Sequence, residues 1–399
     1  MSDIKIFAKT VEETAKEQIE QFASLEAFKN SKIRIMPDVH SGAGCVIGFT
    51  ADLGDKVIPN IVGVDIGCGM LAVNMGKLVD IDLRAVDNYI RNFIPSGMNV
   101  NDAPLITLEE SRIKDLKCFG SLRNVERLVN SVGSLGGGNH FIEIDVDEST
   151  GENWLIVHSG SRNLGKQVAE IYQDIAIKKC NSRKEEAAQL VKEYKEQGRE
   201  REIATALAAL KAQKPNIPND LCYLEGEDRE NYLHDMRICQ RFAELNRFFI
   251  ANSILFFLFN NDFDTIVGMD CFTTMHNYID NNNIVRKGAI SAQKGEKLLI
   301  PVNMRDGCIL GVGKGNEDWN CSAPHGAGRL MSRSKAKETL TMEEYQNTMD
   351  GIYTTSVCHE TLDEAPQAYK PIEEITELIK PTVDIISILK PIYNFKAKE

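Results

Sequence analysis

Glycine-rich turns that carry polar side chains recur along this sequence from residue 37 to residue 328. Short β-like runs lie between them, most densely over residues 32–76, and other segments place apolar residues at helical spacing. No repeat, low-complexity tract or flexible linker divides the chain. These features predict one compact domain of mixed α/β class over residues 1–399, rather than two separable domains.

The charged stretch at about 165–214 predicts a polar helix or helical hairpin that projects from the body as an insertion. The C-terminal segment 371–396 has helical patterning interrupted by Pro381 and Pro391. Periodicity predicts further helices at 10–29, 82–93, 121–131 and 228–259, and strands at 153–160, 264–268, 284–290, 297–302 and 307–313.

The composition is that of a soluble globular protein with a sizeable core, since 43% of the 399 residues are hydrophobic and 26% are charged. No apolar run approaches the ~20 residues that span a bilayer, and the N-terminus carries no apolar signal segment. We therefore expect a cytoplasmic protein with no membrane partner. A formal net charge of −12 argues against indiscriminate nucleic-acid binding, although residues 329–337 carry cations and no anions.

Ten cysteines are scattered along the chain without a CxxC pair. In a reducing compartment such residues behave as small buried hydrophobes. This reading applies to Cys118, Cys180, Cys222, Cys239, Cys271 and Cys358.

Five of the seven histidines lie in glycine-, proline- or asparagine-rich stretches, and the segment "VGVDIGCGM" adds an acid and a thiol, Asp65 and Cys68. One carboxylate, one thiolate and several imidazoles form a mixed donor set for a transition metal, too soft for calcium or magnesium. A thiolate can also bridge two divalent ions. The alternative is that Cys68 is only a small buried residue. The five histidines are His40, His140, His158, His276 and His325.

Two further turns, "SGSR" and "HGAGR", each pair a backbone-rich turn with an arginine, Arg162 and Arg329. Guanidinium groups suit bidentate contact with phosphate. The glycine-rich "GVGKGNE" lacks the spacing of a P-loop, so the loops suggest phosphate ligands without a standard nucleotide-binding fold.

Several long motifs occur in the order found in RtcB-type RNA ligases, and the chain resembles that family from about residue 33 to Lys396. The resemblance implies a single RtcB-like domain that uses GTP and two manganese ions. Such enzymes join RNA ends carrying a 3′-phosphate or 2′,3′-cyclic phosphate to 5′-hydroxyl ends, in RNA repair or tRNA splicing. The motifs are "MPDVHSGAGCVIG", "VGVDIGCGM", "GGGNHFIE", "VHSGSRNLG", "HNY", "RKGA", "GKGNEDWNCSAPHGAGRLMSR" and "DEAPQAYK".

Residue by residue, the resemblance implies that His325 is the nucleophile that holds GMP, and that Cys68 bridges the two metal ions. The remaining metal ligands would be Asp65, His140, His158 and His276. Nucleotide contacts would come from Asn139, Glu143, Asn277, Arg329 and Lys396, and phosphate or RNA contacts from Arg162 and Arg333.

The loop "IPVNMRDG" (300–307) departs from the family's usual Pro-Gly-Ser-Met-Gly pattern, so nucleotide contacts there are expected to differ. The expected partners are RNA with broken ends, GTP and an accessory activating protein. Two other functions remain open: a metal-dependent phosphoesterase that opens cyclic phosphates without ligation, and a non-catalytic RNA-binding protein.

Overall fold

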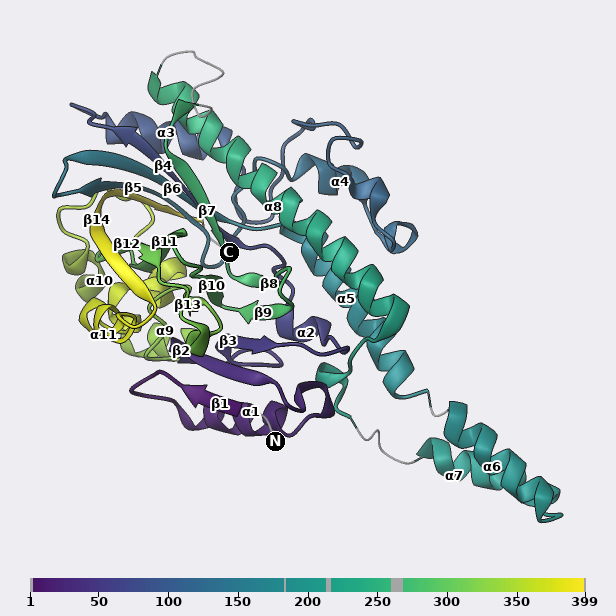
Figure 1. The fold of residues 1–399 in the computed structure, drawn as a ribbon. Coiled ribbons are helices and arrows are strands. Elements are labelled where there is room, and N and C mark those ends of the chain that lie inside the picture. The colour runs from purple at the N-terminus through teal and green to yellow at the C-terminus, as the bar shows by residue number, and fades with distance from the viewer. Residues whose placement is uncertain (1–2, 183, 213–216, 260–267, 398–399) are drawn as a thin grey trace.

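The computed structural model describes residues 3–182, 184–212, 217–259 and 268–397, and it confirms a mixed α/β fold (Figure 1). The largest sheet is antiparallel, and its two edge strands approach each other closely enough for Lys297 Nζ to lie 2.7 Å from Asp270 Oδ2. The sheet is therefore nearly closed. Its strands, in spatial order, are β11 (Lys297–Asn303), β12 (Gly307–Gly313), β14 (Val383–Lys396), β5 (Phe141–Asp147), β6 (Glu152–Ser159), β4 (Gly69–Gly76) and β7 (Cys271–Met275).

A second sheet packs its strands in the order β1, β2, β3, β9 and β8, and a short ribbon pairs β10 with β13. Gly288 separates β9 from β10 with φ +58°, where a Cβ would lie 2.1 Å from the Ile47 side chain. The predicted strand 284–290 is therefore broken in two. The bounds are β1 (Asp3–Ile6), β2 (Lys32–His40), β3 (Ile47–Asp52), β8 (Asn277–Ile279), β9 (Ile284–Lys287), β10 (Ala289–Ser291) and β13 (Ser322–Pro324).

Two long helices, α5 (Arg162–Cys180) and α8 (Gly226–Phe259), pack on each other, and α8 also packs on strands of both sheets (Figure 1). Among the described residues, α8 is the one helix long and apolar enough to cross a membrane, but 44% of its apolar window is buried as in a core helix. The shorter helices are α1 (Glu13–Ala23), α2 (Pro59–Val62), α3 (Leu83–Phe93), α4 (Val125–Asn130), α9 (Arg333–Thr339), α10 (Met342–Thr348) and α11 (Ile372–Leu378).

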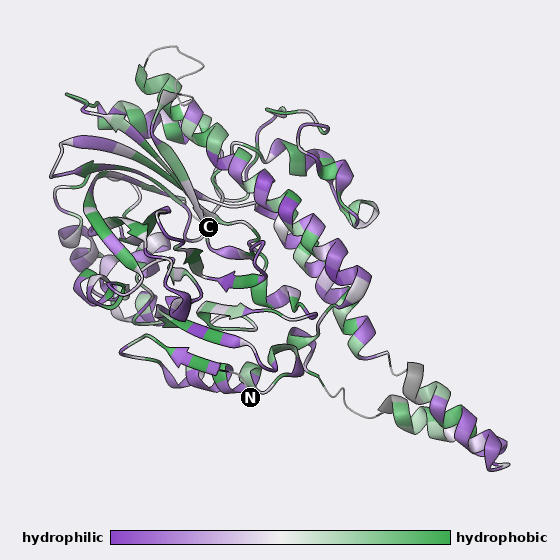
Figure 2. Cartoon of the chain, viewed as in Figure 1, coloured by the Kyte–Doolittle hydropathy of each residue, from purple (hydrophilic) through white to green (hydrophobic). Residues whose placement is uncertain are grey.

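The charged insertion forms two helices, α6 (Lys184–Glu196) and α7 (Ile203–Ala212), that pack on each other and project from the body (Figure 1). In Figure 2, α6 is largely hydrophilic and α7 largely hydrophobic. No described side chain of the hairpin belongs to the buried core of the body.

The C-terminal prediction is wrong: residues 371–396 contain only the short helix α11, and most of the segment is the long central strand β14. Pro391 lies where the register between β14 and β5 shifts, so its missing N–H removes no regular ladder bond. The helices expected at 10–29 and 121–131 are shorter than predicted. Asn124, with φ +53°, directly precedes the start of α4. The strand expected at 264–268 lies mostly outside the described residues.

Candidate metal and nucleotide site

Four of the predicted metal ligands converge at one end of the large sheet. Cys68 directly precedes β4, His140 directly precedes β5, His158 lies near the end of β6, and His276 follows β7. These four strands are neighbours, and Met70 of β4 and Phe141 of β5 both pair with His158. The sheet register therefore brings together residues separated by up to 208 positions, as between Cys68 and His276.

The Cys68 thiol lies at the centre of this cluster. Its Sγ atom is 3.3 Å from Nε2 of His140 and 3.3 Å from Nε2 of His158. The ring centroids of His158 and His276 are 5.3 Å apart, and ligand atoms of Cys68, His158 and His276 all lie within 4.8 Å of one another. All four side chains are buried.

Hydrogen bonds fix how two of the imidazoles face the thiol. Nδ1 of His140 donates to the Leu135 carbonyl at 2.8 Å, and Nδ1 of His158 donates to the Asn139 carbonyl at 3.1 Å, which leaves both Nε2 atoms free as metal ligands. Gly136 permits the close approach of His140, since with φ +90° a Cβ there would lie 2.7 Å from its Nδ1.

Burial determines the protonation of the cluster. It lowers the pKa of His140 to about 4 and the pKa values of His158 and His276 well below the ordinary value, so the imidazoles are neutral. It also raises the pKa of the Cys68 thiol, as does the nearby Asp65 carboxylate. A divalent cation would displace the thiol proton. The buried Nδ1 of His276 has no hydrogen-bond partner among the described residues. The donor set therefore fits a transition metal.

The structure places Asp65 beside the cluster rather than inside it. Its side chain is exposed and lines a cavity together with His140 and Arg162, while its carbonyl accepts the Cys68 N–H. The Arg162 guanidinium donates to Ser134 Oγ at 3.0 Å and to the Gly97 carbonyl at 2.9 Å.

His325 lies next to the cluster, with its ring centroid 4.8 Å from that of His276. Its Nδ1 is 2.7 Å from Oδ2 of Asp38, a fully buried carboxylate that also accepts the His325 backbone N–H at 3.2 Å. Because Nδ1 donates to a carboxylate, Nε2 keeps its lone pair and can act as a nucleophile. The contact between Asp38 and His325 was not predicted from the sequence, although Asp38 lies in the motif "MPDVHSGAG".

A cavity opens beside His325 and is lined by most of the predicted nucleotide-binding residues. The loop 300–307, whose sequence differs from the family's usual pattern, contributes four residues to the cavity wall: Pro301, Val302, Asn303 and Met304. Asn277 is not part of the lining: its amide bridges the Asp65 carbonyl and the Gly288 N–H. Predicted residues in the lining are Asn139, Glu143, Arg329, Arg333 and Lys396, together with His40, His158 and His325.

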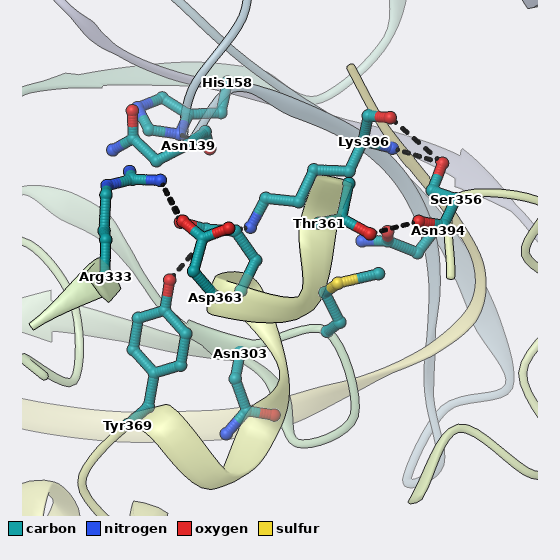
Figure 3. A network of polar contacts seen from close by, with 12 residues as sticks. Asn139, His158, Asn303, Arg333, Ser356, Thr361, Asp363, Tyr369, Asn394 and Lys396 are labelled. Atoms are coloured by element: carbon teal, nitrogen blue, oxygen red, sulfur yellow. Dashed lines mark hydrogen bonds and ion pairs between the residues drawn. The ribbon is translucent and has the colours of Figure 1, made fainter. Parts of the chain in front are cut away.

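An acid pair, Asp363 and Glu364, pairs with several cations of this cavity. Lys396 forms an ion pair with Glu364, and Arg333 Nη1 lies 2.7 Å from Asp363 Oδ2 and 2.9 Å from Glu364 Oε1. Arg329 Nη1 is 3.3 Å from Glu364 Oε1. Figure 3 shows Arg333, Tyr369 and Lys396 directed toward the acid pair. These cations are therefore held in place by protein carboxylates, and only part of their charge is available to a ligand.

The motif "DEAPQAYK" contains Asp363, Glu364 and Tyr369, but the sequence alone predicted no role for these residues. The Tyr369 hydroxyl donates to Glu364 Oε2 at 2.7 Å. The prediction that six of the cysteines are small buried residues is confirmed for Cys118, Cys222 and Cys239. It is wrong for Cys271, which is exposed, and Cys180 and Cys358 are only half-buried.

A second cavity lies beside the Cys68 cluster, lined by Asp65 and His140. It adds the cations Arg127, Arg162 and Lys166, and Arg333 lines both cavities. Three imidazoles and a thiol that could hold a metal ion lie buried between two cavities, next to a histidine oriented by a carboxylate. Such a combination of side chains is typical of an enzyme active site.

Comparison with known proteins specifies this class. The family model described as tRNA-splicing ligase RtcB matches residues 18–120 and 106–397. The chain is 30% identical over 396 residues to the RNA-splicing ligase RtcB of Escherichia coli (strain K12), covering 91% of this chain and 89% of the relative. It is 26% identical over 441 residues to the tRNA-splicing ligase RtcB of Aeropyrum pernix, covering 89% and 85%.

The chain therefore belongs to the RtcB family of RNA ligases, and it is an enzyme.

Proposed function

We propose that this protein is a GTP- and manganese-dependent RNA ligase that works through a guanylylated His325. It joins RNA 3′-phosphate or 2′,3′-cyclic phosphate ends to 5′-hydroxyl ends, in RNA repair or tRNA splicing in the cytoplasm. The observation that carries the proposal is the His325–Asp38 contact of 2.7 Å beside the Cys68 cluster, because it gives a histidine nucleophile a fixed tautomer inside a ligand cavity.

In the first step, His325 Nε2 attacks the α-phosphorus of GTP, pyrophosphate leaves, and a P–N bond to GMP forms. Asp38 holds the ring through Nδ1, accepting the hydrogen bond that strengthens as the ring gains positive charge. Glu143 and Lys396 stand in the cavity wall where they can contact the guanine base. Burial raises the pKa of Glu143 to about 7, so at neutral pH it is partly ionised and can accept base N–H groups.

Cys68, His140, His158 and His276 would hold two manganese ions, with Asp65 completing the set from the adjoining cavity. When bound, the ions would supply positive charge that polarises the phosphate groups. The neutral imidazoles and the deprotonated thiol are the donors that this role requires.

We assign the RNA end to the cavity of Arg127, Arg162 and Lys166. GMP passes from His325 to the RNA 3′-phosphate, which turns that phosphate into an activated ester. The 5′-hydroxyl oxygen then forms the new phosphodiester, and GMP leaves. An accessory activating protein is an expected partner.

Incubation with α-labelled GTP and manganese tests the proposal. We expect an acid-labile GMP adduct on the wild-type protein and none on His325→Ala, with ligation of 3′-phosphate RNA lost as well. His359→Ala is the matched control, because His359 is exposed and lies outside both cavities. Opening of 2′,3′-cyclic phosphate ends without any GMP adduct or ligation would instead support the phosphoesterase.

A further inference from the structure

A second cluster of ligand-type side chains lies inside the large sheet, apart from the Cys68 cluster. Glu143 and Asp145 face the same side of β5, and Cys308 lies on β12. The ligand atoms of these three buried residues all lie within 4.8 Å of one another. Asn394 of β14, the strand between β5 and β12, donates its amide to Glu143. Three neighbouring strands therefore direct two carboxyls, a thiol and an amide to one point.

Lys396 lies near enough to Glu143 to lower its pKa, but Asp145 has no such counter-charge in the described part of the chain. The side chain is 0% exposed, and neither oxygen accepts a hydrogen bond of normal geometry, although the Cys308 thiol lies beside it. Oδ1 of Asn394 is also buried without a partner. Burial and the neighbouring Glu143 raise the pKa of Asp145 well above its ordinary value, and no cation among the described residues pairs with it. Unpartnered buried acceptors are costly unless a ligand satisfies them.

The geometry suits a small, moderately soft cation. Cys308 Sγ lies 3.8 Å from Glu143 Oε2. On tetrahedral zinc, with bonds of about 2.3 Å to sulfur and about 2.0 Å to oxygen, those two atoms would be about 3.5 Å apart. Magnesium and calcium prefer all-oxygen sites and would not select the thiolate.

We propose that Glu143, Asp145 and Cys308 form a zinc site distinct from the Cys68 centre, with Asn394 Oδ1 or a water in the fourth position. Binding displaces the thiol proton and any carboxyl proton to solvent, with no change of oxidation state. The ion ties β5, β12 and β14 together. The ion also holds Glu143 and Asn394 in place. Because both residues line the cavity beside His325, an ion can reach the site through that cavity.

The test uses full-length protein carrying Cys68→Ser, so that the other centre has no thiol. After chelation and dialysis against zinc or cobalt, elemental analysis gives the metal content and absorbance gives the thiolate-to-cobalt charge-transfer band. We expect this protein to show the band, and Cys68→Ser/Cys308→Ser to lose it. Cys68→Ser/Cys239→Ser should keep it, because Cys239 is a buried thiol of another core cluster.

Asp145→Asn in the same background provides a second measurement that does not depend on removing the thiol. We expect its zinc affinity to fall at least tenfold, and the zinc-induced rise in melting temperature to disappear. A missing cobalt band in Cys68→Ser protein, or unchanged zinc affinity in Asp145→Asn, would overturn the site and leave the two carboxyls as a proton-sharing pair. Neither readout involves GTP, so the outcome is independent of guanylylation.

Discussion

The orientation of His325 depends on a single carboxylate that comes from a distant strand. Asp38 lies beside His325 because β2 packs against β13 and the turn that follows it. Gly328, in that turn, allows the close approach of the two segments. A Cβ at Gly328 would lie 2.4 Å from the Asp38 carbonyl oxygen, and the residue has φ +78°. The pairing of acid and histidine is therefore a property of the packing at this turn.

Asp38→Asn should slow guanylylation of His325 by about 10²- to 10⁴-fold while leaving the fold intact, because an amide can donate to Nδ1 and stabilise the wrong tautomer. Single-turnover labelling with GTP measures the rate. Asp55→Asn, at a carboxylate with 84% exposure, is the control and should behave as wild type. An unchanged rate in Asp38→Asn would show that the ring is oriented by other contacts.

At the scale of elements, the acid pair at the end of the 3-10 helix η8 (His359–Glu364) joins α9 to β14 through charge. Burial alone would raise the pKa of Glu364, but Lys396 and Arg333 outweigh it and lower the pKa to about 2 from an ordinary 4.5. Since the folded-state pKa is the lower one, the stabilisation is present above pH 4.5 and is lost as the pH falls toward 2.

Glu364→Gln should therefore destabilise the protein most at neutral pH. The shift corresponds to about 3 kcal/mol of unfolding free energy at pH 7, of which about 2 kcal/mol is lost by pH 3. Urea unfolding at pH 6 and pH 3 should show the gap between wild type and Glu364→Gln narrowing as the pH falls. Glu338→Gln, at an exposed carboxylate of α9, should show no such gap.

The hairpin of α6 and α7 is expected to be dispensable for stability and for the first chemical step. Replacing residues 184–212 with a short glycine–serine linker removes no described side chain of the buried core. We expect full GMP labelling of His325 and a melting temperature within a few degrees of wild type. Loss of labelling would mean that the hairpin contributes to the site.

For the whole molecule, two cavities flank the Cys68 cluster, and under the proposed function one would hold the nucleotide and the other the RNA end. The cations of residues 329–337 do not form a free basic patch, because Arg329, Arg333 and Lys337 pair with Asp363 or Glu364. Since the net charge is also −12, we expect the electrostatic attraction for RNA to come mainly from the cations of the second cavity.

Lys166→Ala should therefore weaken binding of 3′-phosphate RNA and reduce the slope of log affinity against log salt by about 0.7, without slowing GMP labelling. Fluorescence anisotropy over a salt series measures both quantities. Arg84→Ala, at an exposed cation of α3 outside both cavities, is the control. Equal effects of the two substitutions would place the RNA elsewhere.

The amino-acid sequence by itself determined the family and the chemical groups of the site. Each motif is a local run whose order does not depend on folding, so one candidate set of metal ligands could be named before the distances were known: Asp65, Cys68, His140, His158 and His276. The helices at 82–93 and 228–259 were also predictable, because their apolar spacing is local.

The tertiary structure alone decided which of these groups face one another. β14 is a strand because it pairs with β5 and β12 far away in the sequence, and this pairing outweighs the ambiguous local pattern. Asp38, Glu364 and Cys308 acquire their significance in the same way. Each of these residues lies next to its partner only in the folded protein. A contact between residues that are distant in the sequence leaves no periodic signal there.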